Sequence, residues 1–280
     1  IKSYIKGLSH DNVFTLCDDK DGNLWIGTYG GGLDRLKDGK ITSHTTGNGL
    51  SSNAVFSLCS TRDGELFAGT RKGLNRRVSS PDNGPAAFAP VKTLGGELPR
   101  VVVRSISEGP KGNLWVGTDG GLYLLVREET GTGAPAYRIK QRLTGDVSLS
   151  LHHDQQGTSW IGTPVGLMRW KNGELKRVSV KDGLHHNIIH QIMEDNHGYL
   201  WIGSLKGIFR VSKQVLNDFF NDEIDRVFYD YYDENDGMLS RECSGSSQSA
   251  GIRVSTGQLW FSTNKGVVII DPNTTTRKIE

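Results

Sequence analysis

The sequence predicts an all-β protein, a β-propeller made of four-stranded blades. A unit of the form Gly-x-Leu-Trp-aliphatic-Gly-Thr recurs six times, with small variations, along the 280 residues. The aromatic positions of successive copies are 42, 48, 45, 41 and 59 residues apart. A period of about 40 to 45 residues is the length of one propeller blade. The aromatic residues of the six copies are Trp25, Phe67, Trp115, Trp160, Trp201 and Trp260.

The first copy illustrates how one unit divides into four strands. Residues 13–17 form a short β-rich run and are expected to be the innermost strand, followed by a second strand at 24–28. Residues 33–36 alternate apolar and polar side chains, as a third strand does, and the more polar 41–45 form the outer strand. The turns between them are rich in Asp, Lys and Gly, because glycine adopts positive φ without strain.

The interval of 59 residues before the last copy contains an insertion. Its apolar side chains are spaced as one face of a short helix, predicted near 213–223. These side chains are Val215, Leu216, Phe219 and Phe220. Residues 225–232 are predicted to resume as an outer strand, and 79–90 and 128–135 to form surface loops.

Composition and charge disfavour a nucleic-acid-binding protein, a membrane-spanning segment and a disulfide-rich fold. The 33 Lys and Arg against 31 Asp and Glu leave a net charge of +2, which gives no global reason to expect nucleic acid. No apolar run approaches the roughly 18 residues of a membrane span, so we expect no membrane contact by this segment. Three cysteines are too few for a disulfide scaffold. Cys17 and Cys59 hold the same position in successive innermost strands and are predicted to fill the core.

The repeat resembles that of the two-component regulator propeller family. The resemblance rests on residues 23–28, followed by Gly32-Leu33 and by Gly49-Leu50-Ser51-Ser52-Asn53. The same Gly-Leu pair recurs at Gly7-Leu8 and Gly183-Leu184, and residues 241–245, 259–263 and 270–272 resemble the last blade of that family. It implies a periplasmic sensor region of a membrane-bound hybrid histidine kinase or diguanylate cyclase, usually followed by a β-sandwich domain and a membrane segment.

Residues 1–280 are therefore predicted to be a single propeller domain and a fragment of a larger sensor protein. Proteins of the family often carry seven-bladed propellers, whereas six motifs are visible here, so a six- or a seven-bladed propeller stays open. Residues 1–6 are expected to form an outer strand, which could close a six-bladed ring by pairing in the last blade.

We expect a ligand to bind where the loops between second and third strands meet the connections between blades. This loop face collects more Lys and Arg than Asp, which favours an oligosaccharide or another acidic ligand. The candidate binding residues are Tyr29, Arg71, Lys72, Asp119, His185, His186, Asn187, Lys206, Arg241 and Lys265. Other expected partners are a neighbouring propeller or β-sandwich domain of the same protein and a second copy in a homodimer. Exposed charge is also the ordinary state of loop tips.

Catalytic and metal-binding patterns are weak, so we predict a non-catalytic protein with no cofactor and no metal. His152 and His153 are neighbours on a strand and face opposite ways, which disfavours chelation of one metal. His185, His186 and His190 lack the spacing of zinc motifs, and no nucleophile elbow is present. The repeat aromatics are predicted to pack between blades. Two alternatives stay open: a lyase resembling virginiamycin B lyase, with His185 or His186 beside a metal, and a pure interaction scaffold.

Overall fold

The computed structural model describes residues 7–78, 87–129, 136–245 and 247–275. Its described residues form an all-β propeller fold of six antiparallel blades, with one short α-helix, as predicted. The blades group into two compact units, with three blades in residues 1–147 and three in 148–280. The single-domain prediction stays a prediction.

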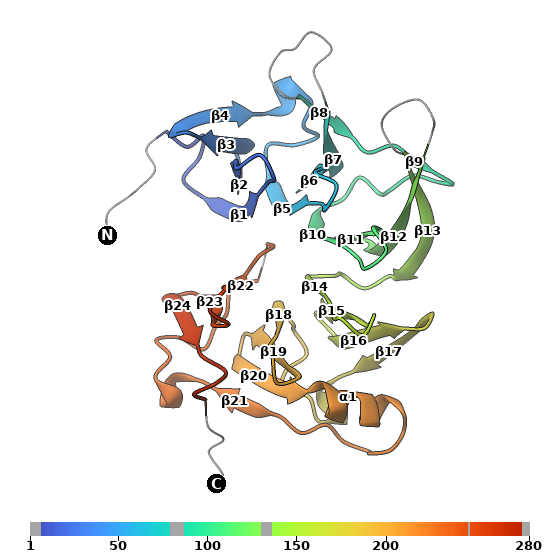
Figure 1. The fold of residues 1–280 in the computed structure, drawn as a ribbon, viewed down its shortest axis with the longest axis vertical. Helices are drawn as coiled ribbons and strands as arrows, with labels where there is room; N and C mark the ends of the chain where they lie inside the picture. Colours follow the sequence, from blue (N-terminus) through green and yellow to red (C-terminus); the bar gives the residue numbers. More distant parts are fainter. Residues whose placement is uncertain (1–6, 79–86, 130–135, 246, 276–280) are drawn as a thin grey trace. The chain divides into compact units, whose positions relative to one another are not determined.

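In the first unit, the strands of each blade pair in chain order, except for the short β9 (Figure 1). The first blade contains β1 (Val13–Asp18), β2 (Leu24–Thr28), β3 (Leu33–Lys37) and β4 (Lys40–His44). The second contains β5 (Val55–Ser60), β6 (Leu66–Thr70), β7 (Gly73–Val78) and β8 (Ala87–Pro90). The third contains β10 (Val103–Glu108), β11 (Leu114–Thr118), β12 (Gly121–Glu128) and β13 (Ala136–Thr144), with the short β9 (Thr93–Leu94) parallel to β13.

The second unit repeats this order and adds the helix α1 (Lys213–Phe220) directly after β20. Its first blade contains β14 (Ser150–His153), β15 (Ser159–Thr163), β16 (Gly166–Lys171) and β17 (Glu174–Val178). Its second contains β18 (Gln191–Glu194), β19 (Tyr199–Ser204), β20 (Gly207–Ser212) and β21 (Asp230–Tyr232). Its third has three strands among the described residues, namely β22 (Gly251–Arg253), β23 (Leu259–Thr263) and β24 (Gly266–Ile270).

In three blades an aspartate of the first hairpin turn accepts the indole N–H of the repeat tryptophan. In the blade of β18 and β19, Asp195 Oδ1 accepts the backbone N–H groups of His197 and Tyr199 at 2.8 and 2.9 Å. Its Oδ2 accepts the indole N–H of Trp201 at 2.8 Å. Asp154 holds Trp160 in the same way, at 3.1 Å. The turn is thereby fixed to the core, since both oxygens of a buried carboxylate are satisfied.

The prediction that the repeat aromatics pack between blades is confirmed for five of the six. Trp25, Phe67, Trp160 and Trp201 are fully buried and Trp115 is 4% exposed. It is wrong for Trp260, which is 37% exposed. The sheet of Trp260 is the last along the chain, and among the described residues of its unit no following sheet covers it.

Several predicted boundaries need correction. The helix ends at Phe220 instead of 223, because Asn221 caps it and Asp222 takes a positive φ of 62°. The outer strand predicted at 225–232 is limited to Asp230–Tyr232. Residues 87–90 are not a loop but the outer strand β8, which pairs with β7. The predictions for 1–6, 79–86 and 130–135 lie outside the described residues.

Both cysteines of the inner strands pack against the core clusters, as predicted, although they are only partly buried. Burial raises the pKa of the Cys17 thiol to about 11 and that of Cys59 to about 12. Loss of water around the thiolate is the main cause of both raised pKa values. These thiols are therefore poorly reactive and serve to pack the core.

Candidate functional site

The two sets of loops predicted to share a face do meet at the same end of each blade. In the first unit, Tyr29 N–H donates to Asn12 at 3.0 Å, and Arg71 N–H donates to Ala54 at 2.9 Å. Each bond joins a loop between second and third strands to the segment that leads into an inner strand. The strand order thus places the predicted loop residues, while binding there stays a prediction.

In the first unit, cations and aromatic rings form a chain across the blades. The Arg71 guanidinium lies 5.0 Å from the ring centre of Tyr29 and donates to its hydroxyl. Phe56 contacts the Tyr29 ring, and Arg104 lies over Phe56 at 5.6 Å. Arg104 in turn pairs with Asp119 at 2.6 Å. Three of the four predicted residues of this unit are therefore linked, whereas Lys72 lines a separate cavity of about 740 Å³.

In the second unit, His185 and Lys206 are in contact. His185 Nε2 lies 3.1 Å from the Lys206 carbonyl, and its ring stacks on Tyr231 at 5.1 Å. Burial lowers the pKa of His185. Tyr229 and Tyr231 beside it are 38% and 52% exposed, so an aromatic surface borders this histidine.

The other four predicted residues of this unit have local partners. His186 Nδ1 accepts the N–H of Ile188 at 3.2 Å, and Asn187 Oδ1 accepts the N–H of Val180 at 2.9 Å. Both side chains therefore shape the connection between blades. Arg241 pairs with Glu234 at 3.4 Å. Lys265 lines a cavity of about 590 Å³.

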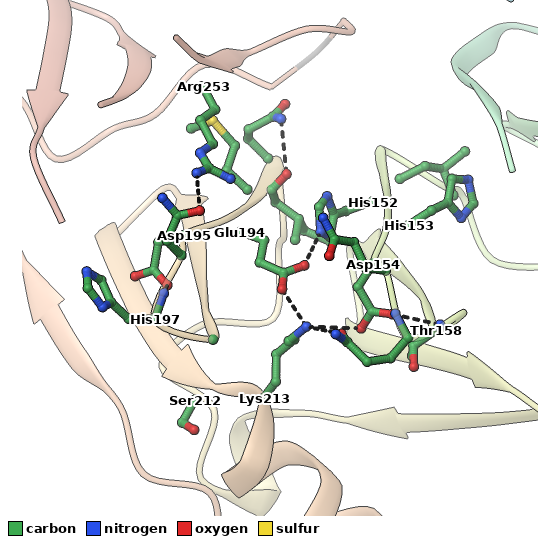
Figure 2. Close-up of a pocket in the computed structure, with 18 of the residues that line it drawn as sticks. His152, His153, Asp154, Thr158, Glu194, Asp195, His197, Ser212, Lys213 and Arg253 are labelled. Carbon is green, nitrogen blue, oxygen red and sulfur yellow. Dashed lines mark hydrogen bonds and ion pairs between the residues drawn. The ribbon is translucent and has the colours of Figure 1, made fainter. Parts of the chain in front are cut away.

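A different cavity, of about 890 Å³, opens at the opposite end of the second unit's blades. The inner strands β14, β18 and β22 supply one part of its wall (Figure 2). The first hairpin turns, residues 154–158 and 195–198, and the start of α1 supply the rest. These turns lie away from the predicted loop face, because they join first to second strands. We call this cavity the turn-face pocket.

The side chain of Glu194, the last residue of β18, lies between the side chains of His152 and Lys213 in this pocket (Figure 2). Its Oε2 lies 2.9 Å from His152 Nε2 on the neighbouring inner strand. Its Oε1 forms an ion pair with the ammonium group of Lys213, the first residue of α1. Burial acts to raise the pKa of Glu194, but the hydrogen bonds from His152 and Lys213 outweigh it and hold this pKa below its usual value.

Lys213 joins two blades. Besides Glu194, its ammonium contacts Asp154 Oδ2 at 3.4 Å and Gln156 Oε1 at 2.6 Å, both from the turn of the preceding blade. A lysine ammonium has three N–H donors, so these three acceptors use all of them. The helical insertion therefore places the cation that connects a turn and an inner strand of the pocket.

His152 and His153 point to different partners, as their adjacent positions on a strand predict. His153 Nδ1 lies 2.7 Å from Ser159 Oγ, on the face away from Glu194. Burial lowers the pKa of His153 to about 4, so this ring is neutral at pH 7.

Sequence reasoning missed Glu194, Lys213 and Arg253 as site residues. The available signal was the end of each inner strand, where polar residues recur beside the turn: Asp18, Ser60, Glu108, His153 and Glu194. The contact of Lys213 with Glu194 could not be predicted from a sequence pattern, because it depends on the direction that α1 takes after the end of β20.

The polar groups of the pocket include a carboxylate whose hydrogen-bond partners lower its pKa. A carboxylate with a lowered pKa is a weaker base than an ordinary glutamate. Among the described residues, no group of three or more His, Cys, Asp or Glu side chains could hold a metal ion. No helix in the described part of the chain is long and apolar enough to cross a membrane.

Comparison with known families confirms the resemblance noted from the sequence. Residues 7–30, 97–120 and 183–206 match the model of the two component regulator propeller family. Two of these stretches begin at the Gly7-Leu8 and Gly183-Leu184 pairs. No curated protein matches the chain.

Solved structures share the fold at low sequence identity. One is described as the extracellular domain of a hybrid two-component system from B. thetaiotaomicron, with 19% identity and a TM-score of 0.54. The match covers 95% of this chain but only 40% of that one. A catalytically inactive virginiamycin B lyase from Staphylococcus aureus, crystallised with quinupristin, has 14% identity and a TM-score of 0.65, covering 94% of this chain and 82% of the lyase. At such identities the likeness shows the fold alone.

Proposed function

We propose that this chain, which carries two-component regulator propeller repeats, is the sensor region of a signalling protein of the two-component type. It binds a ligand or partner domain outside the cytoplasm and is not itself an enzyme. The observation that carries the proposal is the match of three separate repeats to one family model. The similarity of fold to an extracellular domain of a hybrid two-component system, more than twice as long, supports it.

The contacts of the candidate catalytic residues favour binding over the lyase alternative. His185 is held between aromatic rings and the Lys206 carbonyl, and His186 accepts a backbone N–H. Each contact engages one nitrogen of its ring, and among the described residues neither histidine belongs to a group of three or more His, Cys, Asp or Glu side chains that could hold a metal ion. The resemblance to lyases rests on the fold, and fold does not determine chemistry.

The proposed ligand of the loop face is an oligosaccharide or another acidic molecule. Arg71 supplies positive charge there, and the ring of Tyr29, 39% exposed, supplies aromatic surface. The proposed alternative partners are a neighbouring propeller or β-sandwich domain and a second copy of the chain. Signalling requires that the ligand bind one conformational or dimeric state more tightly than the other.

A thermal-shift screen of the chain against acidic and neutral oligosaccharides tests the proposal. A ligand at 100 times its Kd stabilises by about 2.7 kcal/mol, which raises the Tm by a few degrees. We expect a shift that is lost in the Arg71→Ala/Lys72→Ala variant. The matched control is Lys37→Ala/Lys40→Ala, which removes two positive charges from the turn at the opposite end of the first blade.

A shift that survives in Arg71→Ala/Lys72→Ala would move the binding site away from the predicted loop residues. The absence of any shift would contradict direct sensing of a saccharide and favour a scaffold. Placement outside the cytoplasm is tested by protease accessibility of the full-length protein in intact spheroplasts, where protection of the propeller would count against the proposal.

A further inference from the structure

We infer that the turn-face pocket of the second unit is a second binding site, for a small polyhydroxylated carboxylate. This inference rests on the proposed binding function but assigns a site away from the loop face. It follows from which polar groups in the pocket are already engaged and which are not.

The carboxylates of the pocket are occupied by the protein itself. Asp154 and Asp195 each use one oxygen for two backbone N–H groups of their turn and the other for a tryptophan indole. Asp154 also receives Lys213. The two aspartates are 6% and 5% exposed. They hold the turns and leave little capacity for a ligand.

The cations on the pocket wall are not neutralised in the same way. Arg253, the last residue of β22, is exposed and donates to Asn196 Oδ1 at 2.6 Å. Lys171, the last residue of β16, also lines the pocket. Within the described part of the chain, neither has a carboxylate within 4.0 Å in the ion-pair geometry that Lys213 shows. A guanidinium has five N–H donors, so Arg253 keeps four for an anionic ligand.

A carboxylate is the ligand group that matches Arg253 best. The planar guanidinium presents parallel N–H groups that pair with both oxygens of a carboxylate. In Figure 2, Arg253 and Lys213 lie at opposite ends of the drawn group, with Glu194 between them. A ligand held by Arg253 therefore extends along the pocket toward Glu194.

Glu194 is the reason why we infer hydroxyl groups on the ligand. Each of its oxygens accepts one hydrogen bond, from His152 or from Lys213, and a carboxylate oxygen can accept two. Since its pKa lies below the usual range, Glu194 is ionised at neutral pH and accepts a hydroxyl proton donor while repelling a second carboxylate. The amides of Gln155, Gln191 and Asn217 line the remainder and add donors and acceptors for further hydroxyls.

Calorimetric titration of the whole chain with D-glucuronate, D-glucose and acetate as separate probes tests the inference. We expect glucuronate to bind at one site, and glucose and acetate to bind at least about tenfold more weakly, since each lacks one of the two recognised groups. Arg253→Ala should weaken glucuronate binding by about tenfold or more, and Arg253→Lys should restore part of it.

The matched control is Arg226→Ala, which removes an exposed arginine from the segment between α1 and β21, outside the pocket, and should leave glucuronate affinity unchanged. Unfolding midpoints of the variants confirm that the fold is intact. Equal binding by wild type and Arg253→Ala, or binding of acetate as tight as that of glucuronate, overturns the inference. The absence of glucuronate binding at millimolar concentration also overturns the inference. In that case, a thermal shift with a saccharide that depends on Arg71 and Lys72 would still support the proposed function.

Discussion

The ammonium group of Lys213 is ion-paired with the carboxylate of Glu194, and the same ammonium contacts Asp154 from the preceding blade at 3.4 Å. Lys213 begins the only α-helix of the described residues, and Glu194 ends an inner strand. One cation thus connects a helical insertion, an inner strand and a hairpin turn. The geometry of the turn-face pocket depends on this connection.

Replacement of Lys213 by Met should destabilise the protein by about 1 to 3 kcal/mol, because Glu194 and Gln156 lose a donor in a half-buried site. Urea unfolding followed by tryptophan fluorescence measures the change. Lys181→Met, at an exposed position after β17, is the control and should change stability by less than about 0.5 kcal/mol. Equal effects of the two variants would show that the Lys213 contacts contribute nothing.

Replacement of Asp195 by Ala should cost at least about 2 kcal/mol, since two backbone N–H groups and the Trp201 indole lose their acceptor together. Trp201→Phe removes the indole N–H together with part of the buried ring, so its cost combines the lost hydrogen bond with a cavity. The exposed Asp225→Ala variant controls for loss of charge. If Asp195→Ala unfolds at the same denaturant concentration as Asp225→Ala, the hydrogen bonds of Asp195 to its turn and to Trp201 do not stabilise the fold.

Acidification should weaken the fold partly through His153. Its pKa is about 4 in the folded state, below the usual histidine value near 6.5, so the unfolded chain binds more protons between these values. The stability due to neutral His153 is present above pH 6.5 and is lost as pH falls toward 4. Thermal midpoints at a series of pH values should fall less steeply for His153→Gln than for wild type. Parallel curves would contradict the assignment.

Alkylation should distinguish folded from unfolded protein. Because burial raises the pKa of Cys17 and Cys59 well above neutrality, iodoacetamide should modify both slowly at pH 7.5 in the folded chain. In denaturant the rate should rise by at least about tenfold, as the thiolate fraction returns to that of free cysteine. Mass spectrometry of the two peptides reads this out, and rapid labelling of the native protein would contradict their role as core fillers.

The blade fold and most of its packing could be predicted from the repeat. The spacing of Trp25, Phe67, Trp115, Trp160 and Trp201 places each at the same point of one repeated sheet, and a repeated sheet buries the same side chain each time. The same regularity failed for Trp260, because burial there depends on what covers the last sheet of its unit.

Which polar residues share a site could not be predicted from the repeat, because it depends on contacts between blades. His152, Glu194, Lys213 and Arg253 come from three blades and a helix, and no local pattern links them. Local periodicity sets which face of a strand a side chain takes, but contacts between blades depend on sheet twist and on the path of the insertion. The predicted loop residues shared an end of the blades for topological reasons, while their partners, such as Arg104 for Asp119, were decided by packing.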